Sequence, residues 1–193
     1  MNILIIYAHP KKSDCHAAYT LEKITAGLKA KALPYTLIDL YAEGFNPALS
    51  EQELGKQEGT YALDPQVASY QKKIKEADIL IFIYPIWWNS MPAILKGFFD
   101  RVFTARFAFY YYKGIPRPLL KGKKAFVFVT TGAPKLLSFI FMGNRFVPAI
   151  AKDILSFCGI SSTVYHTGSA RALTEVQKAA ITKKVNSMLK KIA

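Results

Sequence analysis

The sequence predicts an α/β fold, with one doubly wound parallel sheet of five strands and helices on both faces. Five runs rich in β-branched and aromatic residues alternate with helix-like segments along the chain. Parallel strands need such crossovers, and right-handed crossovers cover both faces of the sheet. With 193 residues, 51% of them hydrophobic, the chain is long enough for one buried core, and we expect a single domain over residues 1–193.

The first half of the chain supplies two strands and two helices. The run NILIIYA (Asn2–Ala8) is almost continuously apolar, and a helix is expected over Ser13–Ala32, where apolar residues recur on one face. Pro34 introduces the second strand at Tyr35–Leu40. A polar loop then leads to a helix at about Pro65–Glu76.

The second half continues the alternation. Strands are expected at Asp78–Tyr84, Lys124–Thr131 and Ser162–Gly168. Helices are expected at Pro92–Phe103, at about Phe146–Phe157 and from about Thr174 onward. In a three-layer α/β/α fold of this kind, ligands bind beyond the carboxyl ends of the strands. The loops after the first, third and fourth strands are therefore the candidate site.

Charge and cysteine content narrow the class of protein. The net charge is +13, but the lysines are dispersed along the chain. We find no basic helix interleaved with aromatic residues and no zinc-finger spacing, so we assign neither nucleic-acid binding nor a metal site. Cys15 and Cys158 give no disulfide framework, and no apolar run suits a signal peptide or a membrane span. We expect a cytoplasmic protein.

The first loop, HPKKSDCH (His9–His16), lacks both the G-x-G-x-x-G of a dinucleotide-binding turn and the G-K-S/T of a P-loop. It still offers a helix N-terminus, whose free N–H groups near Asp14 and Cys15 can bind an anion, with the Ser13 hydroxyl as a further donor. An ordinary cap, in which Ser13 or Asp14 accepts hydrogen bonds from its own helix, explains the same residues equally well.

The other two loops offer walls and hydrogen bonds. Ser90 can cap the next helix and Pro92 suits its first turn, which leaves Pro85–Asn89 as an exposed arch. Two adjacent tryptophans in that arch either pack into the core or form the wall of a pocket for a flat ring. The loop Thr130–Lys135 adds two hydroxyls and a run of backbone donors. Together the three loops indicate a phosphorylated planar cofactor with the shape of FMN.

Five segments carry a family resemblance: ILIIYAHP, DLYAEGFNPALS, ADILIFIYPIWWNSMPAILKGFFDRVF, KKAFVFVTTGAP and ILSFCG. They resemble the NAD(P)H:quinone oxidoreductase family of flavodoxin-like proteins, in register to about Gly159. The resemblance implies a flavodoxin-like sheet in the order 2-1-3-4-5, a non-covalent flavin and a homodimer with active sites at the interface. It also implies two-electron, ping-pong transfer from NAD(P)H to a quinone or a related acceptor.

The resemblance further implies where the cofactor and the acceptor bind. The cofactor-binding positions fall into three sets. Those expected around the flavin phosphate are His9, Ser13, Asp14, Cys15, His16 and Ala18. Those expected along the isoalloxazine ring are Pro85, Ile86, Trp87, Trp88 and Asn89, and those expected at its pyrimidine end are Thr130, Thr131, Gly132 and Ala133. Phe109 and Tyr111, which would reach across the dimer, and Trp88 are candidates for the acceptor pocket. A plain packed interface is the alternative reading of those two aromatic residues. No side chain is expected as a catalytic acid or base, because flavin N5 carries the chemistry.

The chain departs from the family pattern at two places. Asp14 stands where the family commonly has a small hydroxyl residue, and its carboxylate would repel a phosphate, so we expect it to point outward as a cap. After TTGA the tyrosine and histidine of the better-studied quinone reductases are absent, and the apolar segment Leu136–Met142 lies there instead. The short stretch between Ser50 and Asp78 favours FMN, although FAD is possible.

The sequence does not settle the roles of Cys15 and His166, and it leaves one alternative function. Cys15 is either a reactive thiol at a helix N-terminus or a buried bystander. His166 stands alone in the last strand and is assigned no role. A second hypothesis makes the protein a flavin-bearing regulatory subunit that docks on a membrane potassium-efflux transporter, where its positive surface would suit an anionic membrane.

Overall fold

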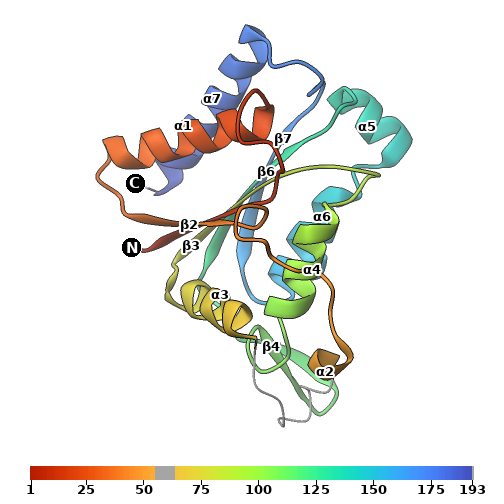
Figure 1. Cartoon of the computed structure of the whole chain (residues 1–193). Helices are drawn as coiled ribbons and strands as arrows, with labels where there is room; N and C mark the ends of the chain where they lie inside the picture. The colour runs from red at the N-terminus through yellow and green to blue at the C-terminus, as the bar shows by residue number, and fades with distance from the viewer. Residues whose placement is uncertain (55–63, 193) are drawn as a thin grey trace.

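The protein is built around a parallel sheet of five strands. The structure is a computed structural model that describes residues 1–54 and 64–192 (Figure 1). The strands are β1 (Ile3–Tyr7), β2 (Tyr35–Asp39), β3 (Ile79–Pro85), β6 (Lys124–Thr130) and β7 (Ser161–Thr167). They lie in the order β2-β1-β3-β6-β7, and every pairing is parallel. This confirms the predicted order 2-1-3-4-5.

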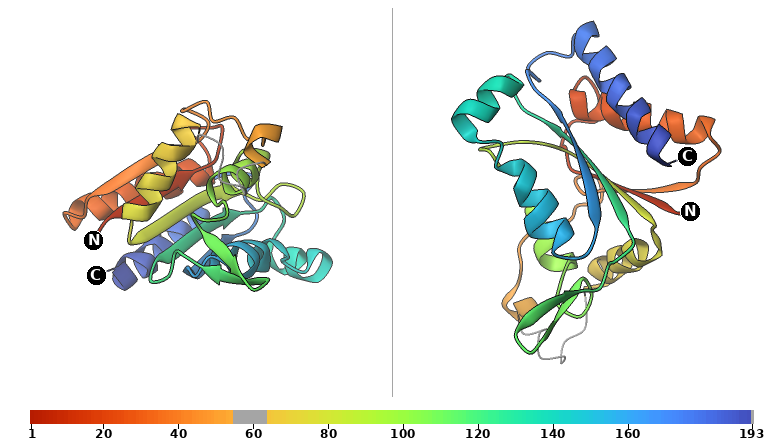
Figure 2. Two further views of the ribbon diagram at one scale, coloured as in Figure 1. Left: turned by 90° about the horizontal axis from the view of Figure 1, so that it is seen from below. Right: turned by 180° about the vertical axis from the view of Figure 1, so that it is seen from behind.

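Helices cover both faces of the sheet, as Figures 1 and 2 show. Side chains alternate along each strand, so Ile3 and Ile5 of β1 pack on one face while Leu4 and Ile6 pack on the other. The first face is covered by α1 (His16–Ala30) and α7 (Glu175–Ile192). The second is covered by α3 (Pro65–Glu76), α4 (Ala93–Val102), α6 (Phe146–Ile150) and the π-helical segment η2 (Ala151–Ser156). The predicted three layers are confirmed.

Three elements were not predicted from the sequence. One is a hairpin of β4 (Phe109–Tyr112) and β5 (Ile115–Pro118), whose two turn residues, Lys113 and Gly114, both have positive φ. Such a turn matches the twist of the strands it joins. The others are the short α2 (Glu51–Leu54) and α5 (Lys135–Met142). Helix α5 is apolar on every side, so it has no periodic pattern to signal a helix.

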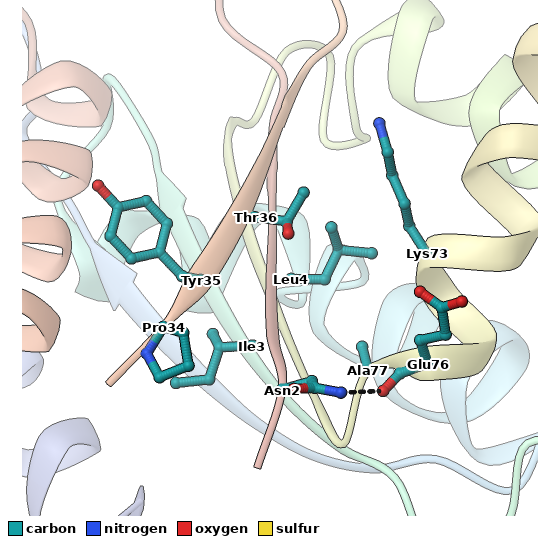
Figure 3. Close-up of a pocket in the computed structure, with 9 residues that line it drawn as sticks. All are labelled: Asn2, Ile3, Leu4, Pro34, Tyr35, Thr36, Lys73, Glu76 and Ala77. Carbon is teal, nitrogen blue, oxygen red and sulfur yellow. Dashed lines mark hydrogen bonds between the residues drawn. The ribbon is translucent and has the colours of Figure 1, made fainter. Parts of the chain in front are cut away.

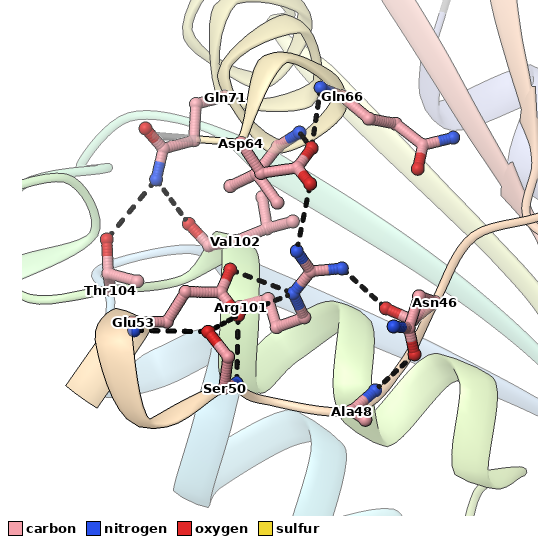
Figure 4. A network of polar contacts seen from close by, with 11 residues as sticks. Asn46, Ala48, Ser50, Glu53, Asp64, Gln66, Gln71, Arg101, Val102 and Thr104 are labelled. Atoms are coloured by element: carbon pink, nitrogen blue, oxygen red, sulfur yellow. Dashed lines mark hydrogen bonds and ion pairs between the residues drawn. The ribbon is translucent and has the colours of Figure 1, made fainter. Parts of the chain in front are cut away.

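Helix α4, which follows the tryptophan loop, is anchored by a buried ionic network (Figure 4). The Arg101 Nε donates to both carboxylate oxygens of Glu53, at 2.9 and 3.1 Å. Its Nη1 donates to the Asn46 carbonyl at 2.6 Å, and its Nη2 donates to the Asp64 carboxylate at 3.2 Å. Ser50 in turn donates to Glu53. The network joins α2, the start of α3 and the end of α4, so the helix behind the tryptophan loop is held firmly.

The described residues include no membrane-spanning helix. Over residues 1–54 and 64–192, no helix combines the length with the apolar character that crossing a bilayer requires.

Candidate functional site

A cavity of about 440 Å³ opens at the carboxyl ends of β1, β3 and β6. The three loops that the sequence singled out meet there. It is lined by His9, Cys15, His16, Ala17, Pro85, Ile86, Trp87, Trp88, Thr130, Gly132 and Ala170. The volume falls in the range of roughly 300 to 1,000 Å³ that is usual for small-molecule sites.

The tryptophan loop is a tight two-residue turn. Trp87 and Ser90 exchange both backbone hydrogen bonds, each at 2.9 Å, across Trp88 and Asn89. These two central residues have φ of +50° and +57°, as a type I′ turn requires. A tryptophan in this left-handed conformation is unusual and strained. The turn lifts the Trp88 side chain out of the core, so that it is 99% exposed.

The exposed arch is shorter than the sequence predicted. Pro85 is the last residue of β3 and is buried, so the arch begins after it. Ser90 does not cap α4, whose N-cap residue is Pro92 and lacks a side-chain hydrogen bond. Trp87 is 43% exposed, and its ring lies 6.4 Å from that of His9, centroid to centroid. The tryptophan pair therefore forms one wall of the cavity and is not core packing.

The first helix begins later, and is capped differently, than the sequence predicted. It starts at His16, and its N-cap residue is Cys15, whose sulfur accepts from the Ala18 N–H at 3.4 Å. Asp14 is exposed, has φ of +51° and accepts from the Ser13 hydroxyl at 3.0 Å. Neither Ser13 nor Asp14 caps the helix, so the expectation that either of them accepts its N–H bonds is wrong.

Cys15 has an environment that favours the thiolate. Partial burial acts to raise the pKa of its thiol, but the side-chain hydrogen bond from His9 and the backbone N–H groups of Ala18 and Ala17 outweigh it. The net effect holds the pKa of Cys15 below its usual value. The sulfur lies 3.8 Å from the His9 Nδ1. By contrast, burial raises the pKa of the Cys158 thiol to about 11.

His16 ties the first loop to the segment after β7. Its Nε2 pairs with the Gln177 side-chain oxygen, and the Gln177 amide donates to the Ser169 carbonyl. His16 is buried and lines the cavity. The contact therefore joins the start of α1, beside the cavity, to α7.

The third loop is held from behind by His166, which sequence reasoning missed. The Thr131 hydroxyl donates to the Ala133 carbonyl at 2.9 Å and lies 2.7 Å from the His166 Nε2. Because the hydroxyl proton is already used, His166 must donate through Nε2. Burial, helped by Lys135 and Lys184, lowers the pKa of His166 to about 4. The imidazole therefore stays neutral near pH 7. A histidine paired with a threonine from another strand leaves no signal in one sequence.

The third loop also packs closely on the segment after β7. The Ser169 N–H donates to the Ala133 carbonyl at 2.9 Å, and the Ala170 N–H donates to the Thr131 carbonyl at 2.8 Å. A side chain at Gly168 would lie 2.6 Å from the Lys135 nitrogen, so only glycine fits there. Ala170 thereby becomes part of the cavity wall, although the sequence did not single it out.

The remaining predicted residues lie beside the cavity or far from it. Those that do not line it are Ser13, Asp14, Ala18, Asn89, Thr131 and Ala133, although each adjoins or lies close in sequence to a residue that does. Phe109 and Tyr111 lie on β4, at the opposite end of the molecule from α5 (Figure 1). The Phe109 ring packs 4.9 Å from that of Phe157. Within one chain these two aromatic residues do not reach the cavity.

A second cavity lies at the opposite edge of the sheet (Figure 3). Its volume is about 240 Å³, and it is lined by Asn2, Ile3, Leu4, Pro34, Tyr35, Thr36, Lys73, Glu76 and Ala77. It sits at the amino ends of β1 and β2, where the Asn2 amide donates to the Glu76 carbonyl at 3.1 Å. Because ligands of doubly wound sheets bind at the carboxyl ends, we take the cavity at that edge as the candidate site.

The cavity at the carboxyl edge combines a flat apolar wall with unused backbone donors. Trp87, Ile86 and Pro85 form the apolar side. The N–H groups of His16, Trp88 and Gly132, which line the cavity, and those of Asp14 and Ala133, which adjoin it in sequence, find no acceptor within the part of the chain that the structure describes. Backbone donors normally find a partner. The arrangement suits a planar ligand that has an anionic group and several hydrogen-bond acceptors.

Comparison with known families and sequences gives consistent matches. The family model described as Flavodoxin-like fold matches residues 1–192. NAD(P)H dehydrogenase (quinone) 1 of Cavia porcellus is 33% identical over 177 residues, which are 81% of this chain and 64% of that protein. The chain thus spans less than two thirds of that relative. A protein of Haemophilus influenzae named an uncharacterized NAD(P)H oxidoreductase is 31% identical over 168 residues, covering 86% of this chain and 82% of that protein.

A solved structure agrees with these matches. The NAD(P)H:quinone oxidoreductase from Methanothermobacter marburgensis superposes with a TM-score of 0.88 and 28% sequence identity. The superposition covers 100% of this chain and 96% of that one. The similarity therefore extends over the three loops as well as the sheet.

Proposed function

The chain belongs to the family of flavodoxin-like fold proteins that includes the NAD(P)H:quinone oxidoreductases, and on this premise we propose that it is a flavin-dependent NAD(P)H:quinone oxidoreductase. The observation that carries the proposal is the cavity at the carboxyl edge, where a tryptophan wall lies close to backbone N–H groups that find no acceptor among the described residues. The relatives described above are named oxidoreductases, and none is named a transporter subunit. The regulatory alternative gains no support from them.

The residues present fit a flavin. The unused N–H groups of Asp14 and His16, at the start of α1, suit a phosphate. The Asp14 carboxylate, which would repel a phosphate, accepts from Ser13 and is exposed. Trp87 and Ile86 offer an apolar surface to a ring, and the N–H groups of Gly132 and Ala133 can donate to its polar edge.

The chain's own residues would bind and orient the reactants. A bound flavin would supply two-electron chemistry, taking a hydride from NAD(P)H and giving it to the acceptor in a separate step. The amides of Gly132 and Ala133 are placed to stabilise negative charge at the polar edge of the ring. His166 positions this loop through Thr131. We assign no side chain as an acid or base. Because both reactants need the same apolar slot, turnover should be ping-pong.

We further propose the finer features of this function. FMN is favoured over FAD, although part of the short stretch on which this rests, residues 55–63, lies outside the described residues. A homodimer would bring Phe109 and Tyr111 of a second copy to the acceptor side of the cavity, since neither reaches it within one chain. Tyr111 is 61% exposed, as expected of a contact residue. Both cysteines are unpaired, which suits a cytoplasmic location.

Anaerobic half-reactions test the proposal. The FMN-loaded protein should be bleached by NADPH or NADH alone, and its colour should return when a quinone is added afterwards. Steady-state rates should show the parallel-line pattern of a ping-pong reaction. Trp87→Ala should weaken FMN binding about tenfold or more, because it removes the aromatic wall.

A matched control separates this loss from a general effect of truncation. Val176 is exposed at the start of α7 and does not line the cavity, so Val176→Ala should bind FMN like the native protein. Loaded protein that neither nicotinamide bleaches would contradict the proposed reaction. Equal FMN affinity in the two variants would contradict the proposed site.

A further inference from the structure

Two lysines meet at the carboxyl end of β7 without a carboxylate. Lys184 of α7 donates to the Thr167 hydroxyl oxygen at 2.6 Å. At the next residue, Gly168, a side chain would lie 2.6 Å from the Lys135 backbone nitrogen, so the start of α5 packs against the same short stretch. Figures 1 and 2 show this end of β7 between α5 and α7. Within the part of the chain that the structure describes, neither lysine forms an ion pair.

This arrangement of positive charge is unfavourable in the chain alone. Burial, helped by the charge of Lys135, lowers the pKa of Lys184 to about 8, so the half-buried ammonium is still mostly charged near pH 7. Burial and the same two lysines also lower the pKa of His166. Lys135 lies in the first turn of α5, where a cation opposes the helix dipole. An anion bound near both ammonium groups would offset each of these costs.

We propose that Lys135 and Lys184 form a binding site for a phosphate group, and that this group is the 2′-phosphate of NADPH. Ammonium groups bind phosphate oxygens through charge-assisted hydrogen bonds. The Thr167 hydroxyl accepts from Lys184, so its own proton is free to donate to the same ligand. Because NADPH differs from NADH only in the 2′-phosphate, the site would select NADPH. The choice of nicotinamide rests on the proposed function, whereas phosphate binding itself does not.

The two lysines lie close enough to the cavity for one dinucleotide to reach both. Gly132 and Ala170 line the cavity. Lys135 follows Gly132 by three residues, Thr167 precedes Ala170 by three, and three residues of extended chain span at most about 11 Å. Backbone hydrogen bonds join the two stretches, from the Thr131 N–H to the Thr167 carbonyl at 3.0 Å and from the Ala170 N–H to the Thr131 carbonyl at 2.8 Å. A dinucleotide with its nicotinamide in the cavity is long enough to place its adenosine end at the lysines.

The phosphate of the flavin is assigned to a different set of donors. The N–H groups that suit it are those of Asp14 and His16, at the start of α1. A protein already loaded with FMN should therefore still have an open site at Lys135 and Lys184. Loss of either lysine should change the affinity for NADPH and leave the affinity for FMN unchanged. This difference separates the proposed site from a second contact to the flavin.

Anaerobic rapid mixing of the FMN-loaded protein with each nicotinamide tests the selection. NADPH should reduce the native flavin at least about tenfold more efficiently than NADH, because hydrogen bonds to a charged group are among the strong ones. Lys184→Gln should remove most of this preference by slowing NADPH alone. The matched control is Lys183→Gln, which removes the same charge from an exposed neighbouring position of α7 and should keep the preference. Equal rates for the two nicotinamides in the native protein, an equal loss in the control, or weaker FMN binding by Lys184→Gln would overturn the proposal.

Thermal unfolding of the FMN-loaded protein tests phosphate binding without any redox readout. Adenosine 2′-phosphate should raise the Tm of the native protein and of Lys183→Gln, but not that of Lys184→Gln, and adenosine should raise none of them. This pattern would support the phosphate site even if neither nicotinamide bleached the flavin, in which case only the proposed function would fail. The same increase in Lys184→Gln would overturn the site. An equal increase with inorganic phosphate would show that the ligand is free phosphate and overturn its assignment to NADPH.

Discussion

The Arg101 network and the carboxyl-edge cavity are opposites in how they satisfy their polar groups. Around Arg101 a buried guanidinium meets the Glu53 and Asp64 carboxylates and a backbone carbonyl. Around the cavity, backbone N–H groups find no acceptor within the described residues, and Trp88 is 99% exposed in a strained turn. The first region is complete within the chain. The second becomes complete only when a ligand binds, which is what separates a structural anchor from a functional site.

The largest effect is expected from breaking the anchor. Arg101→Met leaves the Glu53 carboxylate buried without its cation, which costs about 3 to 5 kcal/mol of unfolding free energy. Urea unfolding should show this loss. As a control on the same helix, Lys96→Met removes the exposed pair with Asp100 and should cost no more than about 0.5 kcal/mol. Equal costs would mean that the Arg101 network is not an anchor.

The same network makes stability depend on pH. Burial acts to raise the pKa of Glu53, but Ser50 and Arg101 together hold it below its usual value. For a carboxylate whose pKa is lowered by folding, the stabilisation is present above the unfolded pKa and is lost as the pH falls through the folded one. The native protein should therefore lose stability below about pH 4. Arg101→Met should lack this part of the acid response.

A second effect comes from His166 behind the site. Its folded pKa of about 4 lies below that of an unfolded histidine, so the unfolded state binds more protons between about pH 4 and 6.5. Stability should fall as the pH is lowered through this window, by at most about 3 kcal/mol. His166→Gln, which can still donate to Thr131, should lack this slope when unfolding is measured at several pH values. The same slope in both proteins would show that His166 is not buried as a neutral group.

A smaller effect is expected at the strained turn. Trp88→Gly removes the strain of the left-handed backbone conformation, which is about 1 to 2 kcal/mol. It also adds a cost of about 0.5 to 1 kcal/mol, because glycine loses more conformational entropy on folding. Stability should rise by about 0.5 to 1 kcal/mol while FMN affinity falls. Lys113→Gly is the matched control, since Lys113 has φ of +51° in the hairpin turn far from the cavity. It should gain stability without a change in affinity. A loss of stability in Trp88→Gly would contradict the claim that the backbone of Trp88 is strained.

The smallest effect is a difference in thiol reactivity. The pKa of Cys15 is lowered and that of Cys158 is raised to about 11, so iodoacetamide should modify Cys15 first near neutral pH. Because Cys15 lines the cavity, bound FMN should slow its reaction. Mass spectrometry of the labelled protein reports both rates. Equal rates, or no protection by FMN, would place Cys15 outside the site.

The sequence predicted the sheet and the three loops because their signals are local. The three central strands β1, β3 and β6 are nearly continuous apolar runs, and each of the three loops follows one of them. The hairpin, α2 and α5 were missed, since α5 is apolar on every side and has no helical period. Contacts that join distant segments were missed as well. Arg101 pairs with Glu53, and His166 with Thr131, across separations that one sequence does not reveal. The cap of α1 was misjudged because Cys15 accepts the bond that hydroxyl and carboxylate residues usually accept.

The most direct test of the central claim is the visible spectrum of the purified protein, followed by chromatography of whatever heating releases from it. The unpaired donors and the tryptophan wall predict a yellow protein that releases FMN. A colourless protein that neither FMN nor FAD can reconstitute would contradict the account, because the cavity would then have no flavin to complete it.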